Sequence, residues 1–179
     1  MRLLTTTILI ALLTAACTST PADSEATTTT AEVTSTTELA GGGEGTTTIP
    51  IQVPPQIADY VVEHVQVGDR MMLLAIADNP GLRAQGLQGV EDLLDLDGML
   101  FFWRHDGDAF WMKDTLIPLD IVWFNEDGTY KDRASMEPCT ADPCPTFRPA
   151  ENLDFRFAIE APPGTLDWIT PDTVITYSD

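Results

Sequence analysis

The sequence predicts a small β-rich domain with one or two short helices. The run 98–124 is the densest apolar stretch outside the N-terminus and contains three Trp and four Phe. Short segments rich in Val, Ile and aromatic residues alternate with turn signals such as Gly68-Asp69 and Asp127-Gly128. Asn79-Pro80 is a typical helix start between two such segments. We interpret 98–124 as three consecutive strands at the centre of the domain.

The charge of the chain restricts its partners. The 179 residues include 28 acidic and 9 basic side chains, which gives a formal net charge of −19. Such a chain repels nucleic acid phosphates and anionic lipid headgroups, so we expect neither as a partner. The length allows one domain with additional segments.

Residues 1–16 have the pattern of a signal peptide. Arg2 supplies a short positive region, Leu3 to Leu13 is apolar, and small residues precede the expected cleavage point. The apolar run is shorter than the roughly 20 residues that span a bilayer. The alternative, an N-terminal core helix, explains the pattern less well.

Cys17 follows directly and accounts for the odd number of Cys residues. The string Leu13-Thr14-Ala15-Ala16-Cys17 resembles a bacterial lipobox, although Thr14 stands where Leu is usual. Residues 17–50 contain long Thr runs and no aromatic residue, which predicts a disordered tether. We therefore expect an exported protein whose domain, residues 51–179, is lipid-anchored at the outer face of the cytoplasmic membrane.

The first elements of the domain are expected from local signals. Residues 60–67 and 70–77 predict two strands paired as a hairpin. A short helix should begin after Asn79 and end near Gly86. Residues 91–97 fit a turn or a second short helix.

The remaining strands follow the apolar pattern. Residues 98–103 are apolar at almost every position, so both faces of this strand should be covered. Further strands are expected at 109–113, 119–124, 129–136, 155–161 and 173–177. Glu160 stands near the end of one of these strands, beside Pro162, and we expect it to be solvated.

Cys139 and Cys144 lie in a tight Pro-rich loop. An exported protein can form a disulfide there. A zinc site would need more ligands nearby, and His64 and His105 are the only His residues in the chain. We favour the disulfide and expect no metal. The sequence contains no P-loop, dinucleotide-binding or zinc-protease motif, so we expect no cofactor.

Several motifs together resemble the DUF192 family of unknown function, also known as UPF0127. They are Arg83-x-x-Gly86-Leu87, Gly98-Met99-Leu100-Phe101, Phe110-Trp111-Met112-Lys113-Asp114-Thr115, Pro118-Leu119-Asp120-Ile121, the Cys139–Cys144 loop and Phe157-Ala158-Ile159-Glu160. The resemblance implies a compact, mostly antiparallel β fold with one or two short helices, and no established reaction. We therefore expect an α+β domain with a barrel-like or sandwich-like sheet. Asp114 and Gln88 replace the Asn and Met that are usual in the family.

Polar residues within the apolar run 98–124 are the first site candidates. Asp120 falls on an apolar strand face, where a buried carboxylate needs a partner such as Lys113 or Arg83. One interpretation is structural, with Asp120 organising a turn or an ion pair. The other is functional. In that interpretation the candidate pocket consists of Arg83, Trp103, Phe110, Trp111, Lys113, Asp114, Thr115 and Asp120.

Two classes of function remain open. The first is a ligand-binding or accessory module of the cell envelope, with an unknown small ligand or envelope component as partner. The second is a hydrolase or lyase acting on an envelope glycan or peptide, with Asp114 and Asp120 as acid and base and Lys113 as electrostatic stabiliser. Carboxyl groups that face an open cleft would favour the enzyme, and sealed ones would exclude it.

Overall fold

The computed structural model describes residues 50–178. The expected signal peptide 1–16, the lipidated Cys17 and the tether up to residue 49 lie outside these described residues. Within residues 50–178, no helix is long and apolar enough to cross a bilayer.

The described chain contains nine strands, one α-helix and one 3-10 helix. In chain order they are η1 (Pro55–Ile57), β1 (Val61–Val67), β2 (Arg70–Ala77), α1 (Pro80–Gln85), β3 (Gly98–Phe102), β4 (Phe110–Trp111), β5 (Leu119–Asn125), β6 (Tyr130–Met136), β7 (Thr146–Phe147), β8 (Phe155–Ala161) and β9 (Ile175–Thr176). The segment 91–97 forms turns, so the helical alternative for it is wrong.

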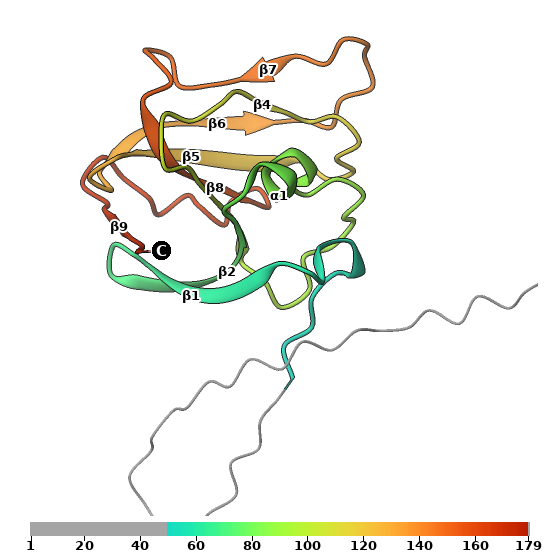
Figure 1. The fold of residues 1–179 in the computed structure, drawn as a ribbon, viewed down its shortest axis with the longest axis horizontal. Coiled ribbons are helices and arrows are strands. Elements are labelled where there is room, and N and C mark those ends of the chain that lie inside the picture. Colours follow the sequence, from blue (N-terminus) through green and yellow to red (C-terminus); the bar gives the residue numbers. More distant parts are fainter. Residues whose placement is uncertain (1–49, 179) are drawn as a thin grey trace, which may run out of the picture.

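Seven of these strands form one sheet in the order β6-β5-β8-β3-β2-β1-β9. Every neighbouring pair is antiparallel except β2 and β3. The sheet curls like half of a barrel, with α1 inside the curl (Figure 1). The mostly antiparallel fold is confirmed. The α+β class is confirmed only in part, because one six-residue α-helix leaves the described chain largely β.

The expectation of three consecutive central strands is wrong. β8 lies between β3 and β5, and β4 pairs with β7 in a separate two-stranded ribbon. Both edges of β3 are already occupied, by β2 on one side and β8 on the other. The next segment along the chain therefore has no free edge of β3 to join, and β4 leaves the sheet.

The central strands of the sheet are buried on both faces, as the apolar run predicts for β3. One face packs under the N-terminal segment, α1, the loop that follows α1 and the β4–β7 ribbon, and includes Ala75, Met99, Phe101, Ile121, Trp123 and Ala158. The other face packs under the C-terminal segment and includes Leu74, Leu100, Val122, Ile159, Leu166 and Ile169. Two cores therefore share one sheet, and alternate residues of a central strand belong to different cores.

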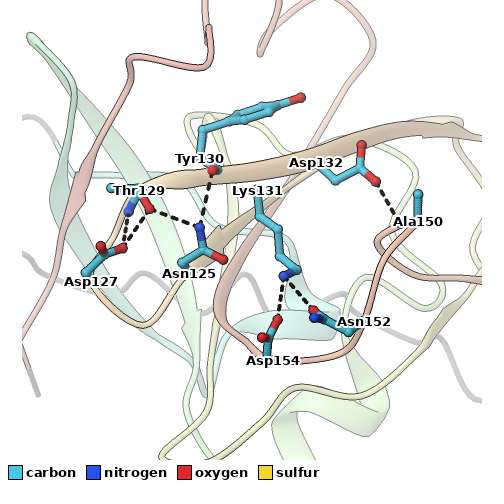
Figure 2. Close-up of polar contacts among 9 residues, drawn as sticks. All are labelled: Asn125, Asp127, Thr129, Tyr130, Lys131, Asp132, Ala150, Asn152 and Asp154. Carbon is cyan, nitrogen blue, oxygen red and sulfur yellow. Dashed lines mark hydrogen bonds and ion pairs between the residues drawn. The ribbon is translucent and has the colours of Figure 1, made fainter.

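Polar contacts fix β6 to its neighbouring loops (Figure 2). The Asp127 carboxylate accepts the backbone N–H of Thr129 at 3.0 Å and its hydroxyl at 2.7 Å, which closes the β5–β6 turn. Further along β6, the ammonium of Lys131 donates to Asn152 and pairs with Asp154. The loop before β8 is thereby held beside β6.

Candidate functional site

A cavity of about 320 Å³ lies beside α1 and against the paired central strands β3 and β8. Its volume falls at the lower end of the range for small-molecule sites. It is lined by Pro80, Arg83, Ala84, Gln85, Gly86, Leu87, Gln88, Phe101, Trp103, Asp108, Ala109, Phe110, Trp111, Thr115 and Glu160.

The local sequence sets the position of α1 beside this cavity. The Asn79 side chain accepts the backbone N–H of Leu82 at 3.1 Å, and Pro80 occupies the first turn. Gly86 ends the helix with a φ of 50°, a left-handed conformation that glycine adopts without strain. A Cβ at Gly86 would lie 3.4 Å from the Phe101 ring, an ordinary van der Waals distance, so it is the positive φ that favours glycine here. The predicted helix start and end are both confirmed.

Arg83 projects from α1 and is held by backbone carbonyls. Its Nη1 donates to the Asp78 carbonyl at 2.7 Å and to the Phe102 carbonyl at 2.9 Å. Its guanidinium carbon lies 5.2 Å from the centre of the Trp103 ring, within cation–π range. Burial lowers the pKa of Arg83, and the nearby Asp78 carboxylate opposes that shift. One cation is therefore fixed at the cavity wall.

Aromatic rings form the apolar part of the cavity. Phe110 packs edge-to-face on Phe101 at 5.0 Å between ring centres and on Trp103 at 5.7 Å. Trp111 alternates with buried Phe110 on β4 and keeps 49% of its surface exposed at the rim. The Lys113 ammonium lies 5.5 Å from the Trp111 ring centre. The β4 segment therefore supplies both a wall and a rim.

Glu160 lies on β8 and is 4% exposed. Its strand partners are Met99 on β3 and Ile121 on β5, both fully buried. Alternation along β8 places Glu160 on the same sheet face as Ala158, which is the face that bears the cavity. The expectation that Glu160 is solvated is wrong, because β8 is an inner strand that is covered on both faces.

No residue of the described chain forms an ion pair or hydrogen bond with the Glu160 carboxyl group. Within residues 50–178, Trp123 Nε1 is the only fully enclosed side-chain nitrogen or oxygen without a partner. The Glu160 oxygens therefore retain contact with open space, which the cavity provides. Burial raises the pKa of Glu160 to about 8. The carboxyl group is therefore mostly protonated at pH 7.

Five of the sequence-predicted residues line this cavity: Arg83, Trp103, Phe110, Trp111 and Thr115. Thr115 also forms an isolated β-bridge with Gln88, which joins the turn after β4 to the loop after α1. Lys113 and Asp114 are exposed and lie outside the lining. Asp114 has a φ of 56°, and its carbonyl accepts the backbone N–H of Gly89 at 2.9 Å. Asp114 therefore occupies a turn position.

Asp120 is buried on the sheet face opposite the cavity. Its Oδ1 accepts the Ser135 hydroxyl at 2.6 Å, and its Oδ2 accepts the backbone N–H of Gly164 at 3.0 Å. Among the described residues no ion pair joins Asp120 to Lys113 or Arg83. These contacts correspond to the structural interpretation of Asp120, in which it organises a turn.

Sequence reasoning did not select four polar residues that line the cavity: Gln85, Gln88, Asp108 and Glu160. Periodicity along 155–161 did not reveal Glu160, because alternation places it on one strand face with Arg156 and Ala158, a pattern typical of a half-exposed strand. The other three stand in a short helix and in loops, where no periodic signal distinguishes them from solvated residues.

Neither a metal cluster nor a cofactor motif accompanies the cavity. Residues 50–178 contain no group of three or more His, Cys, Asp or Glu arranged to hold a metal ion. The sulfur atoms of Cys139 and Cys144 lie 2.16 Å apart, which is the distance of a disulfide bond. This loop is joined to the residue that follows β4, since the Cys139 N–H donates to the Met112 carbonyl at 3.3 Å.

The family model of DUF192, described as "Uncharacterized ACR, COG1430", matches residues 62–176, which is more than half of the chain. The chain belongs to the DUF192 family. The match includes α1, β4 and β8, and so covers every element that lines the cavity. A search of curated proteins finds no match.

Two solved structures resemble the DUF192 domain of this chain. A Novosphingobium aromaticivorans DSM 12444 protein of unknown function aligns with a TM-score of 0.59 and 23% identity, over 76% of this chain and 100% of the other. A Sinorhizobium meliloti 1021 protein described as a candidate transcription regulator aligns with a TM-score of 0.56 and 23% identity, over 65% of this chain and 94% of the other. At this identity the likeness establishes the fold alone.

Proposed function

We propose that this DUF192 domain is a binding module for a small ligand, which enters the cavity beside α1. The observation that carries the proposal is the Glu160 carboxyl group, buried and without a partner among the described residues, at a cavity of about 320 Å³. A buried polar group without a partner is costly, and that cost is relieved when a ligand supplies one.

The rest of the cavity suits recognition. Aromatic rings offer apolar contact, and Arg83, Gln85 and Gln88 supply polar groups. The amide nitrogens of Gln85 and Gln88 already donate to the carbonyls of Gln56 and Ala84, which fixes these side chains in place. Arg83 is held by two backbone carbonyls, so its position does not depend on the ligand. A fixed polar group beside apolar walls reduces the ordering cost of binding.

A binding function is supported over the enzyme alternative by the positions of the proposed acid and base. Both oxygens of Asp120 are occupied by Ser135 and Gly164, and Asp114 is an exposed turn residue. Neither carboxylate lines the cavity. The proposed acid, base and stabiliser therefore lack a shared cleft in which to act on a glycan or peptide.

A panel of small organic molecules tests the binding proposal by ligand-observed NMR on the full chain. Ala84→Trp places an indole at the cavity wall, and Ala150→Trp places the same group on an exposed loop away from it. We expect ligands that bind the parent chain and Ala150→Trp but not Ala84→Trp. Equal binding to all three chains, or no binding to any, would contradict the proposal.

We also propose that the mature protein is a lipoprotein of the bacterial envelope, anchored through Cys17. The support is the signal-like segment 1–16 that ends at a Cys, followed by the Thr-rich segment 17–50. Cys139 and Cys144 lie at disulfide distance from one another, which leaves Cys17 without an intramolecular partner cysteine.

Fractionation of cells that express the full chain or Cys17→Ala tests this anchor. We expect the parent chain in the membrane fraction and the variant in the soluble exported fraction, since stable anchoring needs more than one acyl chain and the lipidated cysteine carries several. Equal soluble release of both chains would contradict lipid anchoring.

A further inference from the structure

We propose that the ligand of this cavity is a small organic cation, an ammonium or amidinium group on an apolar body, with Glu160 as its counter-ion. This inference rests on the proposed binding function and specifies the chemical class of its ligand.

The hydrogen-bonding state of Glu160 favours a ligand that donates hydrogen bonds. An ionised carboxyl group accepts hydrogen bonds and donates none, and no described residue donates one to Glu160. A cation with N–H groups supplies donors and compensates the buried charge at once. Such charge-assisted hydrogen bonds are about twice as strong as neutral ones.

The charge at the cavity wall also favours a cation. The titratable or charged groups that line it besides Glu160 are Arg83 on α1 and Asp108 in the loop before β4. The strands on either side of Glu160 place apolar Met99 and Ile121 opposite it. With Glu160 ionised, two carboxylates and one guanidinium line the cavity, so the wall carries a net negative charge.

The aromatic rings of the cavity wall are suited to a cation. The faces of Trp and Phe rings attract cations, and Trp103 already accepts the Arg83 guanidinium in this manner. Phe101 and Phe110 supply further ring surface. The net charge of −19 on the chain also raises the local concentration of small cations around the molecule.

Binding of a cation should release a proton. Burial raises the pKa of Glu160 to about 8, so this carboxyl group is mostly protonated at pH 7 before a ligand binds. The proton on the carboxyl oxygen leaves to the buffer, and the carboxylate that forms pairs with the ligand cation. The affinity should therefore rise about tenfold per pH unit up to about pH 8 and then level off.

Three matched probes test the proposal by calorimetry on the full chain: benzylamine, benzyl alcohol and benzoate. At pH 7 we expect benzylamine to bind at least about tenfold more tightly than the other two, as expected for a buried charge pair. Calorimetry in two buffers of different ionisation enthalpy should report the release of close to one proton per benzylamine.

Charge-removing variants complete the test. Glu160→Gln should lose the preference for benzylamine and its proton release, while Glu63→Gln, which removes an exposed charge on β1, should retain both. Tighter binding of benzoate, or equal binding of benzylamine and benzyl alcohol, would overturn the cation proposal and leave a small-ligand cavity in place. Failure of all three probes to bind would overturn it as well, and if the wider panel also fails, the binding function falls with it.

Discussion

The carboxylate of Asp120 accepts the backbone N–H of Gly164 at 3.0 Å, across 44 positions of sequence. This bond fastens the turn that follows β8 to the beginning of β5. The same carboxylate accepts the Ser135 hydroxyl on β6 at 2.6 Å. One buried side chain therefore ties the β5–β6 hairpin to the distant turn that follows β8.

Replacing this carboxylate should weaken the fold without affecting the cavity. Asp120→Asn removes a charged acceptor from two buried hydrogen bonds and should lower the free energy of unfolding by about 1–3 kcal/mol. Asp114→Asn is the matched control, because it makes the same change at an exposed turn position where Asn is equally suited. Urea denaturation of both variants checks the prediction, and equal stability of the two would contradict the role of Asp120.

Glu160 should make the stability of the domain depend on pH. Its pKa is raised from 4.5 to about 8 on folding, so the unfolded chain is ionised between these values while the folded chain remains protonated. The contribution of Glu160 to stability is therefore largest below about pH 4.5, falls as the pH rises and is constant above about pH 8.

The comparison with Glu160→Gln isolates this effect from the many other carboxylates. The free energy of unfolding of the variant minus that of the parent chain should rise from pH 5 to pH 8, by on the order of a few kcal/mol. Denaturation curves of both chains at these two pH values provide the measurement. A difference between them that does not change with pH would contradict the raised pKa.

Leu94 has an exposed side chain and a left-handed backbone conformation, with a φ of 56°. Such a backbone costs a non-glycine residue about 1–2 kcal/mol. Leu94→Gly should therefore leave stability unchanged or raise it by up to about 1 kcal/mol, despite the greater entropy of Gly in the unfolded chain. Leu116→Gly, at a similarly exposed Leu without positive φ, should lose about 0.5–1 kcal/mol. Equal losses in thermal melts would refute the strain at Leu94.

Local signals predicted much of the fold. Asn79, Pro80 and Gly86 act through contacts within a few residues, so the limits of α1 could be inferred from the sequence. The hairpins β1–β2 and β5–β6 likewise follow from short turns between apolar segments.

Contacts between distant segments were not predictable in this way. The insertion of β8 between β3 and β5 depends on pairing across more than fifty residues, for which no local pattern exists. The burial of Glu160 follows from that insertion, and so does its position in the cavity lining. Asp120 was correctly placed in an apolar strand. The β5–β6 hairpin accounts for its pairing with Ser135, but its other partner, Gly164, lies on a segment whose position only the whole fold determines.

We expect the Cys139–Cys144 pair to be oxidised, because the proposed export would place it in an oxidising compartment. Intact mass measurement after alkylation without reductant should find both residues unmodified, and addition of reductant should make both reactive. Reduction opens a short loop and should lower stability by about 2 kcal/mol. Alkylation of both residues before reduction would contradict the disulfide.

The central claim is that Glu160 is a buried, ligand-facing carboxyl group, and NMR titration of its carboxyl carbon tests this claim most directly. In the free protein we predict a midpoint at about pH 8. With saturating benzylamine the midpoint should move down by at least about one pH unit, because the cation stabilises the ionised form. A midpoint near 4.5 in the free protein would contradict the account, since Glu160 would then titrate as a solvated side chain.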